Sequence, residues 1–139
     1  MTAKEYMSQL RRLDAQIRNK RLEMEDIWNR MKGVQAINYE PKEGISGTKN
    51  TKSPQEKYFN LYEQYRNDLK KTLMESIAKR KEIMQVVDSI ENGYYIDLLQ
   101  KRYFQYESWE QIASEMNYSL PYVYQLHGEA LQEVKKRIG

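Results

Sequence analysis

Apolar residues recur at alternating spacings of three and four through the first 34 residues of the chain. The series consists of Ala3, Tyr6, Leu10, Leu13, Ile17, Lys20, Met24, Ile27, Met31 and Val34, with the lysine as its polar exception. Such a heptad pattern places a narrow apolar stripe on a helix, and another helix must cover that stripe. Thr2 and Glu5 have the spacing of a capping box, which favours a helix start. The pattern therefore predicts a long helix over residues 2–34 that forms a coiled-coil seam.

A second amphipathic segment follows a polar connection. Residues 36–54 are rich in Gly, Ser, Thr and Asn and predict a flexible loop. Ser53 with Pro54 favours a helix start, and Asn92-Gly93 favours its end. The apolar positions of this helix are Tyr58, Tyr62, Tyr65, Leu69, Leu73, Ile77, Ile83 or Met84, Val87 and Ile90. Two long helices joined by a loop predict an antiparallel helical hairpin over residues 1–93, which closes on itself or pairs with a partner.

The spacing of apolar residues becomes shorter in residues 94–139. A first short helix is predicted around residues 95–103. Ser108 and Ser119 are the predicted N-caps of a second and a third helix. The last two helices fit a helix-turn-helix when Trp109 is counted as its first position. The five apolar positions of that motif hold Ile112, Met116, Tyr118, Val123 and Leu126. Ala113 supplies the small residue where the helices approach, and Asn117 tolerates the positive φ that the turn requires.

Composition argues against several other classes of protein. The chain has no cysteine and one histidine, so thiolate sites, histidine metal sites and a Ser-His-Asp triad are not expected. No apolar run has the length of a membrane-spanning helix, and the N-terminus lacks the apolar region of a signal peptide. Scattered carboxylates such as Glu110 and Glu115 have no convergent partner. The sequence predicts a cytoplasmic, non-enzymatic, all-α protein without a cofactor or metal and without membrane association.

The net charge of +3 is unevenly distributed. Residues 1–54 contain 11 basic and 7 acidic residues, whereas residues 94–139 contain 5 basic and 6 acidic residues. The predicted helix-turn-helix is therefore not a basic module by itself, which weakens nonspecific binding to phosphates.

The segment from Leu98 to Lys136 resembles region 4 of sigma-70-type factors. The matching residues are Arg102, Tyr103, Phe104, Ile112, Ala113, Met116, Ser119, Val123, Ala130 and Leu131. Together with the long N-terminal helices, the chain is similar to small sigma-region-4-like proteins of phages and prophages of Gram-positive bacteria. That family is related to phage transcription regulators of the ArpU/RinA type. The resemblance implies a trihelical DNA-binding domain, but the usual basic residues after Ser119 are missing, and so is region 2.

The function expected from the sequence is a sequence-specific, DNA-binding regulator of phage or prophage transcription. Its reading helix would begin near Ser119 and enter the major groove of double-stranded DNA, and the coiled coil would make a dimer or another homo-oligomer. The predicted DNA-binding residues are Ser119, Leu120, Pro121, Tyr122, Tyr124, Gln125, His127, Gly128, Lys101 and Arg102. Gln125 suits a bidentate contact with adenine, and His127 either donates to a phosphate or faces solvent.

Two alternatives remain open at this point. Exposed tyrosines without charge also suit a protein interface, so the same helices would dock on RNA polymerase or another protein without reading bases. A phage terminase small subunit also combines a helix-turn-helix with helical oligomerisation.

Overall fold

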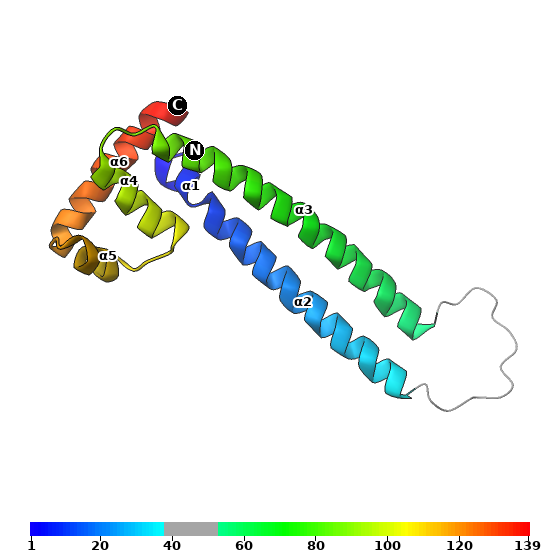
Figure 1. Cartoon of the computed structure of the whole chain (residues 1–139). Coiled ribbons are helices and arrows are strands. Elements are labelled where there is room, and N and C mark those ends of the chain that lie inside the picture. The colour runs from blue at the N-terminus through cyan, green and yellow to red at the C-terminus, as the bar shows by residue number, and fades with distance from the viewer. Residues whose placement is uncertain (38–52) are drawn as a thin grey trace, which may run out of the picture. The chain divides into compact units, whose positions relative to one another are not determined.

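The computed structural model describes residues 1–37 and 53–139, and every regular element in these two stretches is a helix. In chain order they are α1 (Ala3–Met7), α2 (Gln9–Ile37), α3 (Pro54–Asp88), α4 (Gly93–Leu99), η1 (Gln100–Phe104), α5 (Trp109–Met116) and α6 (Leu120–Ile138) (Figure 1). The predicted all-α class is confirmed. Most of the predicted loop over residues 36–54, and the side chain of Val34, lie outside the described part.

The described residues form two compact units. One unit combines Met1–Asp14 with Glu75–Gly139, and the other consists of Ala15–Met74. The predicted division after residue 93 does not coincide with this boundary. The difference arises because α1, the start of α2 and the end of α3 pack with the C-terminal helices.

Side-chain caps fix the starts of several helices at the predicted residues. The amide of Glu5 donates to Thr2 Oγ1 at 3.1 Å, and the amide of Thr2 donates to Glu5 Oε2 at 2.8 Å, which completes a capping box. Ser53 accepts from the amide of Glu56 at 3.2 Å at the start of α3. These bonds satisfy amides that have no partner within the first turn of a helix.

The heptad pattern predicted one continuous N-terminal helix, but the helix is interrupted at Ser8. Ser8 Oγ donates to the carbonyl of Lys4 at 2.7 Å, and Gln9 Nε2 donates to the carbonyl of Tyr6 at 2.9 Å. Side chains of this kind compete with the backbone for its hydrogen bonds and favour a break in a helix. The interruption separates the short α1 from α2, and α1 contacts α6.

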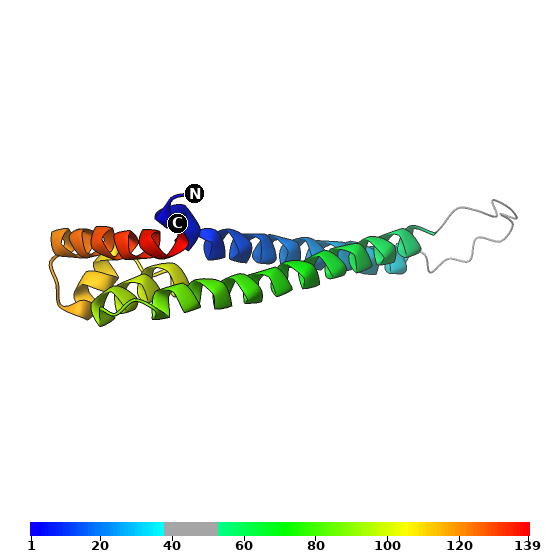
Figure 2. The ribbon, with the colours of Figure 1, turned by 90° about the horizontal axis from the view of Figure 1, so that it is seen from above.

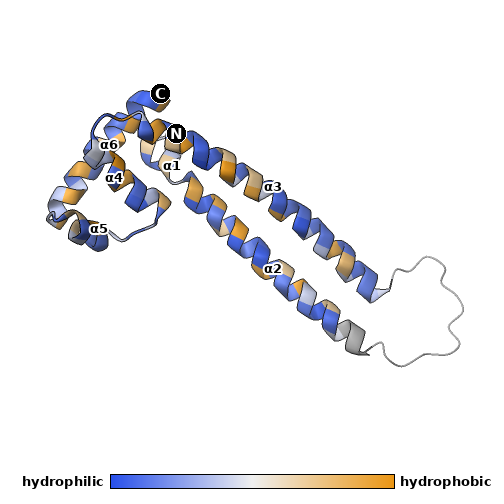
Figure 3. Cartoon of the chain, viewed as in Figure 1, coloured by the Kyte–Doolittle hydropathy of each residue, from blue (hydrophilic) through white to orange (hydrophobic). Residues whose placement is uncertain are grey.

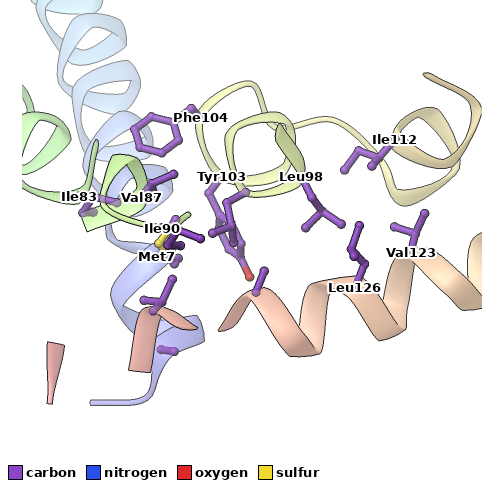
Figure 4. Packing of buried hydrophobic residues seen from close by; sticks show 14 of the residues in the cluster. Met7, Ile83, Val87, Ile90, Leu98, Tyr103, Phe104, Ile112, Val123 and Leu126 are labelled. Carbon is purple, nitrogen blue, oxygen red and sulfur yellow. The ribbon is translucent and has the colours of Figure 1, made fainter. Parts of the chain in front are cut away.

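A single apolar cluster holds the first unit together (Figure 4). Met7 comes from α1, Ile83 and Val87 come from α3, and Leu98 comes from α4. All four of these side chains are fully buried. The cluster continues between α5 and α6, so the C-terminal helices and the N-terminus share one core.

The connection from α3 to α4 differs from the prediction. Asn92 does not end the preceding helix, because α3 already ends at Asp88. Asn92 is instead the N-cap of α4 and accepts from the amide of Tyr94 at 2.9 Å. The end of α3 is stabilised from a distance by Arg137 of α6, which donates to Ser89 Oγ at 2.8 Å and to the carbonyl of Ser89 at 3.2 Å.

In the second unit, the later part of α2 and the first part of α3 lie side by side and run in opposite directions (Figures 1 and 2). Ile17, Ile27 and Met31 of the predicted seam are buried, and the ring of Trp28 contacts that of Tyr62 at a centroid distance of 5.6 Å. Figure 3 shows that apolar positions occur as isolated bands along largely hydrophilic helices. This pattern is what a narrow helix–helix seam requires.

The predicted stripe of the second helix is wrong at Ile77, whose side chain is 63% exposed. The buried positions of this stretch are Thr72 and Ser76, followed by Ile83 and Val87. Successive residues of a helix point about 100° apart, so Ile77 lies beside this line rather than on it. Of the two alternatives Ile83 and Met84, Ile83 is the one that is fully buried.

Candidate nucleic-acid interface

Helices α5 and α6 are joined by a turn of three residues, Asn117–Ser119. Asn117 ends α5 in the left-handed conformation with φ 58° and ψ 40°, as its place in the sequence predicted. Ser108 accepts from the amide of Gln111 at 3.1 Å, and Ser119 accepts from the amide of Tyr122 at 3.3 Å. The two caps and the left-handed residue therefore fix where one helix ends and the next begins.

The inner faces of α5 and α6 hold the residues that the helix-turn-helix spacing places there. Ile112 and Val123 are fully buried, and Ala113 and Leu126 are nearly so. Figure 4 shows Ile112, Val123 and Leu126 directed toward the same interior. Met116 and Tyr118 are half-buried and pack against the edge of this cluster. The core leaves the opposite side of α6 open to solvent.

The open side of α6 carries uncharged polar and aromatic residues. Tyr122 and Tyr124 are 42% and 48% exposed, and Gln125 is exposed as well. Ser119, Pro121 and Gly128 are also exposed, whereas Leu120 is half-buried against the core. Gln125 Nε2 donates to Glu129 Oε1 at 3.3 Å. We call this set of exposed residues from Ser119 to Gly128 the α6 face.

Gly128 lies within α6, where glycine costs about 1 kcal/mol relative to alanine. A Cβ atom added to Gly128 would meet no other atom of the described chain within 4 Å. No other backbone of the described chain therefore approaches Gly128 closely. Packing inside the chain does not explain a glycine at this position.

Two aromatic groups border the α6 face. On one side, Tyr118 contacts Tyr122 at a centroid distance of 4.8 Å and Tyr94 at 6.4 Å. On the other side, Trp109 contacts Tyr124 at 5.5 Å. Edge-to-face contacts of this kind restrict ring orientation, so the exposed tyrosines are held rather than free to rotate.

His127 is half-buried, so the alternative that it faces solvent is wrong, whereas donation to a phosphate stays a prediction. Its Nε2 is 2.6 Å from the hydroxyl oxygen of Tyr103, and its ring packs against Trp109 at a centroid distance of 4.5 Å. Burial, followed by the positive charges of Lys4 and Arg102, lowers the pKa of His127 to about 4. Burial raises the pKa of the Tyr103 hydroxyl to about 12, so this group stays protonated and shares a hydrogen bond with the neutral imidazole.

Lys101 and Arg102, which were predicted to contact phosphates, both have partners within the chain. Lys101 Nζ is 2.7 Å from Glu115 Oε2, and this hydrogen bond is the main reason that the pKa of Glu115 is lowered. Arg102 Nη1 donates to the carbonyl of Glu107 at 2.9 Å, and its guanidinium lies over the ring of Trp109 at 4.3 Å. Binding of DNA by Lys101 would have to compete with its ion pair.

Lys4, Arg11 and Tyr106 lie beside the start of α5, and no sequence signal predicted a role for them. No motif connects them, because Tyr106 is far in sequence from Lys4 and Arg11 and only the fold brings them together. Among residues 1–37 and 53–139, no group of three or more metal-binding side chains gathers at one place. None of the helices that the structure describes has the length and apolar character needed to cross a bilayer.

A family model with the description "Protein of unknown function (DUF1492)" matches residues 41–135, which is more than half of the chain. The chain belongs to this family. The part that matches the DUF1492 model contains the whole of α3, α4, η1 and α5 and most of α6, and therefore the α6 face. Comparison with curated proteins and with solved structures gave no match.

Proposed function

We propose that this protein is a sequence-specific DNA-binding regulator of phage or prophage transcription, and that α5 and α6 form a helix-turn-helix of the sigma-region-4 type within a trihelical domain. The α6 face would enter the major groove of double-stranded DNA with its N-terminal end near Ser119. A single observation carries the proposal. The turn at Asn117 and the buried residues Ile112, Val123 and Leu126 leave one continuous side of α6 uncovered.

Gly128 supports the same interpretation. Its cost to the helix has no explanation inside the described chain, and it lies on α6 three residues after Gln125 and four after Tyr124. A partner that approaches the backbone of α6 closely would need a residue without a side chain there. DNA lying along the α6 face provides such a partner.

The experiment that tests this proposal is selection of bound duplexes from a random DNA pool, followed by affinity measurements on the selected site. Gln125→Ala should weaken binding by about 5- to 150-fold and relax the preference at one base pair, because a bidentate contact contributes about 1–3 kcal/mol of discrimination. Gln132→Ala is the matched control, since Gln132 is also an exposed glutamine of α6 but lies about two turns beyond Gln125, past the C-terminal end of the α6 face. Equal effects of the two variants, or an unchanged base preference in both Gln125→Ala and Tyr122→Ala, would contradict the assignment.

We further propose that the protein works as a dimer joined through its long helices as a coiled-coil hairpin. The unit Ala15–Met74 exposes the apolar side chains Leu22, Trp28, Phe59 and Leu61. Two copies would present two α6 faces to two half-sites, and the second binding event would become intramolecular. Sedimentation should then show a dimer at micromolar concentration, and a monomer that still binds the selected DNA with full affinity would refute this arrangement.

A second candidate function is binding to RNA polymerase or another protein without base readout. The exposed Tyr122 and Tyr124 favour it, because tyrosine is enriched in protein interfaces and the α6 face has no basic residue. The two functions respond differently to salt. DNA binding should weaken steeply as salt is added, whereas polymerase binding through tyrosines should persist without DNA.

A further inference from the structure

A small cavity with a basic lining lies within the unit that contains Met1–Asp14 and Glu75–Gly139. Lys4 of α1, Arg11 of α2 and Arg102 of η1 line it, and aromatic rings of Tyr106 and Trp109 complete its walls. Its volume is about 170 Å³. Pockets for whole cofactors or drug-sized ligands are larger, at roughly 300–1,000 Å³. The cavity therefore has room for one compact chemical group.

The cations of this cavity are not neutralised by neighbouring acids. Among the residues that the structure describes, no carboxylate oxygen lies within ion-pair distance of Lys4, Arg11 or Arg102. Asp14, which accepts a hydrogen bond from the Tyr106 hydroxyl, has Arg80 as its ion-pair partner at 3.7 Å. The field of Lys4 and Arg102 also reaches His127, whose pKa it helps to lower. An anion in the cavity would meet uncompensated positive charge.

Tyr106 is held in an unfavourable backbone conformation beside this cavity. Its φ of 57° lies in the left-handed region, which costs an ordinary residue about 1–2 kcal/mol. The hydrogen bond to Asp14 fixes its side chain, and the guanidinium of Arg11 lies 5.9 Å from the centre of its ring. Backbone strain of this kind is found where a chain positions a functional group. Here the strained residue carries the ring that contacts the guanidinium of Arg11.

We propose that this cavity binds a phosphate group through Lys4, Arg11 and Arg102. Two guanidinium groups and an ammonium supply more donors than the two oxygens of a carboxylate can use, whereas a phosphate offers further oxygens and up to two negative charges. Trp109 connects the cavity to the α6 face, because its ring also contacts Tyr124. The phosphate belongs either to a free phosphorylated molecule or to the backbone of the DNA. Only the second source rests on the proposed function.

Intrinsic fluorescence can follow this binding in the full chain. The protein contains two tryptophans, Trp28 and Trp109, so a Trp28→Phe background leaves only the one that lines the cavity as a reporter. Inorganic phosphate should change the emission saturably, while potassium chloride and acetate at the same ionic strength should not. In that background, Arg11→Gln and Lys4→Gln should each weaken phosphate binding by about tenfold or more, because hydrogen bonds between charged groups are among the strong ones.

Arg12→Gln is the matched control, since Arg12 is the exposed neighbour of Arg11 and does not line the cavity. Saturable phosphate binding that is lost in Arg11→Gln and kept in Arg12→Gln supports the proposal. Absence of saturation, acetate binding as tight as that of phosphate, or equal losses in the two variants would overturn it.

A separate measurement on DNA identifies the source of the phosphate. If a backbone phosphate enters the cavity, Arg11→Gln should weaken DNA binding equally for all sequences and reduce the salt slope by about one, and Arg12→Gln should not. Unchanged DNA binding in Arg11→Gln, together with saturable binding of inorganic phosphate, assigns the cavity to a free phosphorylated molecule. Loss of base preference in Gln125→Ala concerns the α6 face alone, so failure of the phosphate cavity and failure of the proposed function are distinguishable.

Discussion

Acidification should destabilise the core around His127. The pKa of this imidazole is about 4 in the folded protein instead of its usual 6.5, because burial and the charges of Lys4 and Arg102 disfavour the protonated ring. A protonated ring would place an unpaired positive charge next to Lys4 and Arg102 in this half-buried position. Between about pH 6.5 and pH 4 the unfolded chain therefore binds more protons than the folded one. The free energy of unfolding should be highest above this range and fall as the pH decreases through it.

The difference between the two pKa values corresponds to about 3 kcal/mol at 1.36 kcal/mol per pKa unit. Part of the ring is in contact with water, so screening by solvent reduces this to about 1–2 kcal/mol. More than half of the interval between the folded and unfolded pKa values of His127 lies above pH 5. We therefore expect urea titrations followed by circular dichroism to give an unfolding free energy about 1 kcal/mol lower at pH 5 than at pH 7 because of this one residue.

His127→Phe isolates the effect. Phenylalanine keeps an aromatic ring next to Trp109 but does not titrate. Between pH 7 and pH 5, the unfolding free energy of the variant should therefore fall by about 1 kcal/mol less than that of the native protein. The pKa values of Glu115 and Glu133 are lowered by hydrogen bonds with Lys101 and Arg137, respectively. Their contributions fall mainly at lower pH and are common to both proteins. Identical pH dependence of the two proteins would refute the reasoning.

Substitutions at three further positions test individual features by chemical denaturation. Asn117→Ala should destabilise the protein by about 1 kcal/mol, because a φ of 58° is unfavourable for alanine, while Asn117→Gly should be close to neutral. Ile112→Ala should cost about 2–5 kcal/mol, since the side chain is fully buried, and a loss below 1 kcal/mol would show that the site is not a packed core. Gly128→Ala should stabilise the protein by about 1 kcal/mol but weaken its binding to selected DNA, and a stabilised variant with unchanged affinity would remove DNA contact as the reason for this glycine.

The features that were predictable from the sequence depend on short spacings along the chain. Ser53, Ser108 and Ser119 cap the helices that follow them, and Asn117 has the predicted positive φ. A cap needs only an oxygen and an amide two or three residues away, so local chemistry determines it. The buried positions of α5 and α6 were predictable for a similar reason, because helical periodicity fixes which residues share a face.

The errors occurred where a distant segment decides the local structure. Asn92 is compatible with either the end of one helix or the start of the next, and the interaction of Arg137 with Ser89 favours an earlier end of α3. Met7 was outside the predicted seam, but α6, which is distant in sequence, packs against α1, and Met7 is completely buried. His127 has an outward-facing position by spacing alone, but Tyr103 of η1 and Trp109 of α5 contact its ring and partly bury it. None of these partners is close in sequence.

Charge illustrates why the location of residues matters more than their number. The segment 94–139 has one more acidic than basic residue, which suggested a weak attraction for phosphates. In the folded unit, Glu115 and Glu133 are paired with Lys101, Lys136 and Arg137. Lys4 and Arg11, which belong to the N-terminal segment, lie beside the start of α5 without a carboxylate partner among the described residues. Because unpaired charges at short range act on a ligand more strongly than a net sum does, a nearly neutral unit can still hold one strongly basic cavity.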